Sequence, residues 1–256
     1  MVSVALHTAD ALAGVGASIH NAVAHSAVAR DLVLAAGTTD WDNLKPTMVT
    51  AFWTTLWMVG WTILLGGLFG LIIGVLLYAS RSSGVLANKP LYWTLNILVN
   101  IIRPIPFIIL IAAAGPLTKA VMGTTIGTEA ATFVMVIAAT FAVARIVEQN
   151  LVSVDPGVVE AARAMGASPL KILWSVVIRE ALGPLILGYT FIFIAIVDMS
   201  AMAGYIGGGG LGDFAITYGY RAFDWNVTLV ATVIIIVLVQ FAQLIGNTLA
   251  RLVMRR

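Results

Sequence analysis

Apolar residues are gathered into five long runs along the chain, at about 53–78, 92–115, 127–147, 184–205 and 226–249. Each run is roughly 20 residues or longer, which is the length an α-helix needs to cross a hydrocarbon core of ~30 Å at ~1.5 Å per residue. The pattern therefore predicts an all-α, polytopic membrane protein with five transmembrane helices, each in contact with membrane lipid.

One stretch, residues 155–183, is too polar to lie in lipid and too regular to be a tail. Asp155-Pro156 and Ser168-Pro169 each place a capping residue before a proline suited to a first helical turn. Gly166 and Gly183-Pro184 are typical stop signals. The stretch is predicted to be a hairpin of two short helices joined by a corner, with the second helix closed at Gly183-Pro184.

The composition excludes several kinds of chemistry. Of 256 residues, 60% are apolar and 10% are charged, with no cysteine. Disulfides, zinc-thiolate sites and thiol nucleophiles are therefore excluded. The three histidines lie in the first 25 residues and carboxylates are dispersed, so neither a catalytic constellation nor a metal or other cofactor is expected. The net charge of +2 gives no indication of a nucleic-acid partner.

Two nucleotide-binding motifs can be set aside. Gly207, Gly209 and Gly212 satisfy G-x-G-x-x-G, but no strand precedes them, as the dinucleotide fold requires. The glycine run is better interpreted as backbone that bends tightly beside a cavity. No G-x-x-x-x-G-K-[ST] occurs, so ATP is not expected to bind through a P-loop of this chain.

Basic residues predict the orientation. If the hairpin and the C-terminus are cytoplasmic, that side holds nine Lys and Arg, and the other side holds four. The positive-inside rule then places the N-terminus outside. We expect an extracytoplasmic or surface extension over 1–48, a transmembrane domain over 49–250 with the hairpin at 155–183, and a basic cytoplasmic tail over 251–256.

Small and charged residues in the spans predict internal contacts. Gly66, Gly70 and Gly74 recur every four residues, which favours close approach of another helix. Arg145 and Glu148 are three residues apart and able to pair.

Polar residues occur in several spans. Asn96, Asn100 and Arg103 share one helical face of the second span, and Gln240, Gln243 and Asn247 follow one face of the fifth. Such residues are costly in lipid and should face protein or water. Polar contacts between helices and a substrate path both remain open interpretations.

The hairpin carries the most specific motif. Glu160-Ala161-Ala162 followed by Gly166 closely resembles the E-A-A-x-x-x-G motif in the cytoplasmic loop of permease subunits of bacterial ABC importers. The resemblance implies that the first hairpin helix, over 156–165, docks into a groove on an ATPase subunit. The implied docking residues are Glu160, Ala161, Ala162, Arg163, Met165 and Gly166.

Further segments resemble methionine importer permeases, in the same order and at similar spacing over about 50–250. They are RPIPFIIL at 103–110, GTTIG at 123–127, EAARAMGA at 160–167, SAM at 200–202 and GGLG at 209–212 through YGY at 218–220. The resemblance implies the type I ABC importer permease fold in a bacterial inner membrane. It also implies a homodimer, two ATP-binding ATPase subunits that hydrolyse the ATP, an extracytoplasmic substrate-binding protein, and D- or L-methionine or a close analogue as cargo.

Three positions depart from the family pattern. Arg179 stands where a proline is usual, and Asp198 and Met199 stand where small or aromatic residues are expected. An acid at this depth can favour a cationic group or pair with Arg103. We hypothesise a substrate path lined by Arg103, Asp198, Met199, Ser200 and Met202. Alternatives are a permease for another amino acid or a small cation, and an ion-coupled carrier that uses Asp198 and Arg103 without an ATPase.

Overall fold

The computed structural model describes residues 39–82 and 84–254, and this part of the chain is helical with no strands. Four helices are long and apolar enough to cross a membrane, and the count is five when a bent pair of helices is taken as one span. The all-α polytopic fold is therefore confirmed. The predictions for 1–38 lie outside the described residues.

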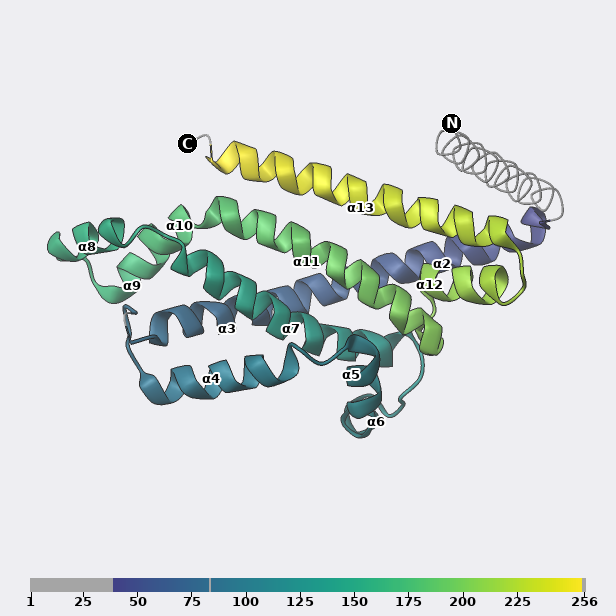
Figure 1. Ribbon diagram of the computed structural model, residues 1–256, viewed down its shortest axis with the longest axis horizontal. Helices are drawn as coiled ribbons and strands as arrows, with labels where there is room; N and C mark the ends of the chain where they lie inside the picture. Colours follow the sequence, from purple (N-terminus) through teal and green to yellow (C-terminus); the bar gives the residue numbers. More distant parts are fainter. Residues whose placement is uncertain (1–38, 83, 255–256) are drawn as a thin grey trace, which may run out of the picture.

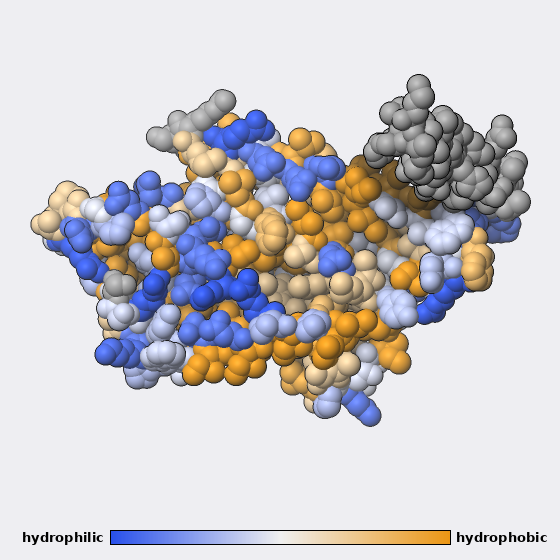
Figure 2. Space-filling view, viewed as in Figure 1, coloured by the Kyte–Doolittle hydropathy of each residue, from blue (hydrophilic) through white to orange (hydrophobic). Residues whose placement is uncertain are grey.

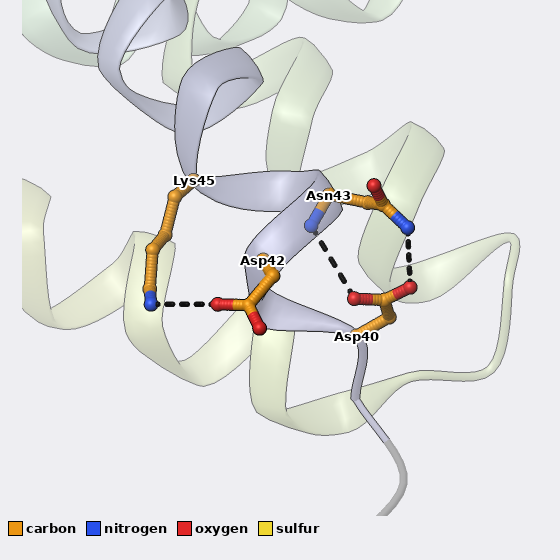
Figure 3. A network of polar contacts seen from close by, with 4 residues as sticks. All are labelled: Asp40, Asp42, Asn43 and Lys45. Atoms are coloured by element: carbon orange, nitrogen blue, oxygen red, sulfur yellow. Dashed lines mark hydrogen bonds and ion pairs between the residues drawn. The ribbon is translucent and has the colours of Figure 1, made fainter.

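The first span is one continuous helix over Trp41–Ser80. It consists of α2 (Trp41–Trp61), a π-helical turn (Thr62–Gly66) and α3 (Gly67–Ser80). The helix begins well before the predicted start at about residue 53, because its first turns are polar and give no hydropathy signal. The Asp40 carboxylate caps it by accepting a hydrogen bond from the Asn43 amide at 3.3 Å (Figure 3).

The same first turns hold an ion pair between Lys45 and Asp42, with 3.1 Å from Nζ to Oδ1 (Figure 3). Both side chains are largely exposed, so the pair stabilises the helix by about 1 kcal/mol at most. The capping contact of Asp40 therefore defines the start of α2 more than this ion pair does.

The second span is not the single helix that was predicted over 92–115. It consists of α4 (Lys89–Ile102) and α5 (Phe107–Ala113), which meet at an angle of 106°. The break contains Pro104 and Pro106, whose rings remove two backbone N–H donors and clash with a continuing helix. A further short helix, α6 (Gly115–Met122), follows.

The remaining spans are α7 (Thr128–Val152), α11 (Leu182–Ala203, continued by a π-helical turn to Gly208) and α13 (Trp225–Met254). In Figure 1, α7 runs through the middle of the bundle and α13 lies along its edge. The burial of the two helices agrees with these positions. In the most apolar 18-residue stretch of each helix, 56% is buried for α7 but only 11% for α13.

The glycine stripe packs α3 against α7, as predicted. A Cβ atom added at Gly70 would lie 2.5 Å from Val143 Cβ, and one at Gly74 would lie 2.6 Å from Val147 Cβ. Such contacts leave no room for any side chain at these positions. Tyr189 of α11 adds a third helix, because its hydroxyl donates to the Gly67 carbonyl at 2.8 Å.

At the end of the bundle far from the hairpin, the glycine run bends the backbone beside a cavity. Gly207, Gly209 and Gly210 have φ of 90°, 75° and 85°, values that favour glycine. A cavity of about 380 Å³ is lined partly by Gly209 and Gly210. The next helix, α12 (Gly210–Phe214), is held where the Thr55 hydroxyl accepts a hydrogen bond from the Leu211 amide at 2.8 Å.

Candidate functional site

The first half of the hairpin is a capped helix, α8 (Pro156–Ala164). The Asp155 carboxylate accepts a hydrogen bond from the Gly157 amide at 2.8 Å. The corner falls at Gly166, whose φ is +77° and whose amide donates to the Arg163 carbonyl at 2.9 Å. The predicted start at Pro156 and the glycine corner are both confirmed.

The second half of the hairpin consists of α9 (Pro169–Ile172), a π-helical turn (Leu173–Val177) and α10 (Ile178–Glu180). The prediction that Gly183-Pro184 closes it is wrong. The break falls at Ala181, and Gly183 and Pro184 lie in the first turn of α11. Proline is tolerated there because a first-turn amide needs no helical partner. Figure 2 shows hydrophilic residues gathered towards the end of the molecule that carries this hairpin.

The residues implied in docking divide into an exposed set and one buried member. Ala162 is 4% exposed and joins the main hydrophobic core, whereas Met165 is 81% exposed. The other exposed members are Glu160, Ala161, Arg163 and Gly166. The small side chain of Ala162 therefore seats α8 on the bundle, while the exposed set is open to solvent.

Arg163 is turned partly towards its own chain. Its Nη2 lies 3.5 Å from the Gly84 carbonyl, in the loop between α3 and α4. Both residues, with Tyr78, Arg81 and Glu160, line a cavity of about 440 Å³ between α8 and the end of α3. Sequence reasoning missed this contact, because no local signal relates residues so far apart along the chain.

The helices that enter and leave the hairpin are braced together. Arg145 Nη1 lies 2.7 Å from Glu148 Oε2 within α7, which confirms the predicted ion pair. The Asn150 side-chain amide donates to the Pro184 carbonyl at 3.2 Å and so joins α7 to α11. A displacement of the hairpin can therefore be passed to both spans.

The proposed path residues of α11 do not share one face. Asp198 and Met202 are exposed one turn apart, and Asp198 is the single charged residue in Leu182–Gly208. Ser200 is 3% exposed, and its hydroxyl donates to the Val197 carbonyl at 2.7 Å. Met199 is half-buried against the core. The structure thus brings Asp198 and Met202 together and turns the other two inward.

Arg103 lies exposed at the break between α4 and α5. Within the described residues the ion pairs are Lys45 with Asp42 and Arg145 with Glu148. The hypothesis that Asp198 pairs with Arg103 is therefore wrong for this structure. The nearby amides pair with each other, since Asn100 Nδ2 donates to Asn96 Oδ1 at 3.2 Å.

A cation–π contact completes the open face of α11. The Arg221 guanidinium lies 5.5 Å from the centre of the Tyr205 ring, and the Tyr205 side chain is 53% exposed. No sequence pattern predicts this pair, because Arg221 belongs to the segment between α12 and α13 and no spacing rule connects it to α11.

Membrane-spanning helices, an open helix face that carries Asp198, and an exposed helical hairpin beyond the spans describe a membrane subunit with a surface that another protein can contact. The chain belongs to the family described as the binding-protein-dependent transport system inner membrane component, whose model matches residues 66–256. It is thus an inner-membrane component of a transport system.

Individual relatives agree with this family. The chain is 44% identical to the probable D-methionine transport system permease protein MetI of Vibrio cholerae, over 82% of this chain and 93% of that protein. It is 40% identical to the methionine import system permease protein MetP of Bacillus subtilis, over 71% of this chain and 82% of that protein.

Solved structures show the same architecture. An inward-facing MetNI methionine ABC transporter has a chain that matches with a TM-score of 0.79 and 38% identity, over 82% of this chain and 98% of that one. An amino acid ABC transporter solved with histidines matches with a TM-score of 0.70 at 21% identity and supports the fold alone.

Proposed function

We propose that this chain is the permease subunit through which an ATP-driven ABC importer moves methionine, D- or L-, or a close analogue across the inner membrane. The observation that carries the proposal is the preformed helix α8. It presents Glu160 and Ala161 to solvent, with Met165 exposed at its C-cap, and is fixed to the bundle through Ala162. The relatives named for methionine transport supply the cargo.

The proposed assembly contains two copies of this chain, two ATPase subunits and an extracytoplasmic binding protein. ATP would be hydrolysed in the ATPase subunits, so this chain is not itself an enzyme. The family description names a binding protein, and the likeness to an ABC transporter structure supports the ATPase partners.

We place the N-terminus outside and the C-terminus in the cytoplasm. The count of nine basic residues against four supports this orientation. In Figure 1, α2 begins at the end of the bundle away from the hairpin, and α13 ends near it. The domain limits remain predictions, and two helix starts fall inside them: the first helix begins at Trp41, within the proposed extension, and α11 begins at Leu182, within the predicted hairpin.

The mechanism follows from how α8 is held. When the ATPase subunits close on ATP, they move the docked α8. Because Arg163 contacts the α3–α4 loop and Asn150 joins α7 to α11, the movement reaches three spans together. The bundle then switches the path between outward and inward access.

The exposed face of α11 is the proposed wall of that path. Met202 is 39% exposed, and its thioether is polarizable enough to pack against the side chain of methionine. Asp198, one turn away, attracts the ammonium group of a substrate that moves along the path. Arg103 remains a proposed member at the break between α4 and α5, and Met199 and Ser200 act by packing behind the wall.

Substituting Met202→Ala is expected to raise the KM for uptake several-fold and leave co-purification of the ATPase subunit unchanged. The reason is that the side chain contacts cargo and lies far from α8. Met202→Leu, which keeps the volume, serves as the control. Unchanged uptake kinetics for Met202→Ala would show that this residue does not line the path.

Within the described residues the Asp198 carboxylate is in no ion pair, which favours a second candidate, a permease for another amino acid, such as a cationic one, or for a small cation. An ion-coupled carrier that uses Asp198 and Arg103 is a further alternative and would need no ATPase. Proteoliposomes that contain the purified complex distinguish these cases. Methionine uptake that requires ATP supports the proposal, and uptake driven by an ion gradient without an ATPase subunit contradicts it.

A further inference from the structure

Helix α13 carries three amide side chains that the proposed path leaves unexplained, Gln240, Gln243 and Asn247. Gln240 and Asn247 are exposed and Gln243 is half-buried. An amide in hydrocarbon without a hydrogen-bonding partner is costly. This flank of α13 should therefore meet water or protein and not lipid tails. In Figure 2, hydrophilic residues mark the surface over the C-terminal half of α13.

The angles of the amides around the axis of α13 can be worked out relative to the residue of α13 that contacts α11. A Cβ added at Gly246 would overlap the Thr190 side chain of α11, so Gly246 faces that helix. Ala242, Ile245 and Leu249 line an apolar groove that α13 shares with α11 and α3. At ~100° per residue, the groove residues lie about 40–100° to one side of Gly246, and the three amides lie about 60–120° to the other side.

The same count on α11 starts from Thr190. Ile186 and Phe193 line the shared groove and lie about 40–60° to one side of Thr190. Asp198 and Met202 lie about 80–120° to the other side. Because the groove marks the same flank of both helices, the amides of α13 and the Asp198 face of α11 share the opposite flank.

The amides of α13 and the Asp198 face of α11 also follow one another in height along the bundle. A Cβ at Gly183 would contact Met254, so the hairpin-side ends of α11 and α13 are level. At ~1.5 Å per residue, Asn247 lies ~10 Å from this end, Gln243 ~16 Å and Gln240 ~21 Å, while Asp198 lies ~22 Å from it. The amides therefore extend from near the hairpin to the level of Asp198.

We propose that Gln240, Gln243 and Asn247 line the hairpin-side half of the substrate path and continue the line that Asp198 and Met202 begin. This inference rests on the proposed function. This row of side chains fits a zwitterionic amino acid as substrate. Each amide offers an N–H donor for the carboxylate group and a carbonyl acceptor for the ammonium group. Neutral amides hold either group weakly, which suits release from a path.

The test uses the absence of cysteine from the native chain. Gln243→Cys and Asn247→Cys each introduce a single thiol into this chain, which is tested within the complete transporter in inside-out vesicles. The probe is a membrane-impermeant, charged thiol reagent added to the hairpin side. Phe241→Cys is the matched control, because Phe241 is 65% exposed in the single chain but lies about 140° from Gly246, away from the amides.

We expect both test thiols to be labelled at least tenfold faster than the control thiol. Labelling no faster than that of Phe241→Cys would overturn the inference. A disulfide between two copies that shields the thiols would overturn it too, in favour of a subunit contact. Gln240→Cys provides a third site if a variant fails to assemble. ATP-dependent methionine uptake by the unmodified transporter is measured in parallel. Fast labelling of the test thiols without methionine uptake would support the path lined by the amides and contradict methionine as its cargo.

Discussion

Replacing Gly166 by valine is expected to lower ATP-dependent uptake at least tenfold while the membrane helices stay folded. Gly166 has φ of +77°, and a Cβ added there meets no atom within 4 Å. Crowding is therefore not the cause of the effect. The cause is the backbone, because a β-branched residue at positive φ is a genuine outlier and the left-handed conformation costs a non-glycine residue about 1–2 kcal/mol. The backbone at the corner would relax to negative φ and change the direction of α8.

The controls separate this backbone effect from general damage. Gly166→Asn should retain most of the uptake, since asparagine tolerates the left-handed conformation. Uptake in vesicles and co-purification of the ATPase subunit are measured on the same preparations. Normal coupling in Gly166→Val, or equal loss in Gly166→Asn, would show that the corner does not set the docking geometry.

The second large effect is expected at Gly70, where valine should prevent recovery of a folded permease. A Cβ there would lie 2.5 Å from Val143 Cβ and 2.7 Å from the Thr140 carbonyl oxygen of α7. Backbone and a short β-branched side chain cannot move aside as a long side chain can. Inserting even single methylene groups into such a packed site costs about 1–3 kcal/mol, and α3 would be pushed away from α7.

Gly60→Val is the matched control for this substitution, because Gly60 belongs to the same 40-residue helix and a Cβ there meets nothing within 4 Å. The amount of monodisperse protein recovered in detergent is the measurement. We expect at least a tenfold loss for Gly70→Val and little change for Gly60→Val. Equal recovery of the two variants would contradict the close packing of α3 on α7.

The spans and the hairpin could be predicted because their signals are local. Apolar runs of sufficient length mark the helices, and Asp155, Pro156 and Gly166 mark the ends of α8 through chemistry that acts within one turn. The glycine stripe also predicted correctly that α3 approaches another helix closely. It could not identify α7 as the partner, because the pairing depends on residues about 70 positions further along the chain.

The remaining features required three-dimensional information. Prolines at 104 and 106 signal a break, but the 106° bend depends on how α5 packs against the bundle. Apolar residues occur on every side of α11, so the sequence could not show that Ser200 is turned inward while Asp198 is exposed. The contact of Arg163 with Gly84 joins segments that are 79 residues apart, and no spacing rule reaches so far.

The most direct test of the central claim, that an ATPase subunit docks on α8, is cross-linking from one introduced thiol. Met165→Cys, at a side chain that is 81% exposed in the single chain, is compared with Ile126→Cys, at one that is 68% exposed on the opposite side of the bundle. A thiol-to-amine cross-linker is applied to membranes that contain the co-expressed ATPase subunit. We predict a permease–ATPase adduct from position 165 and none from position 126. No adduct from position 165, or equal adducts from both positions, would contradict the account.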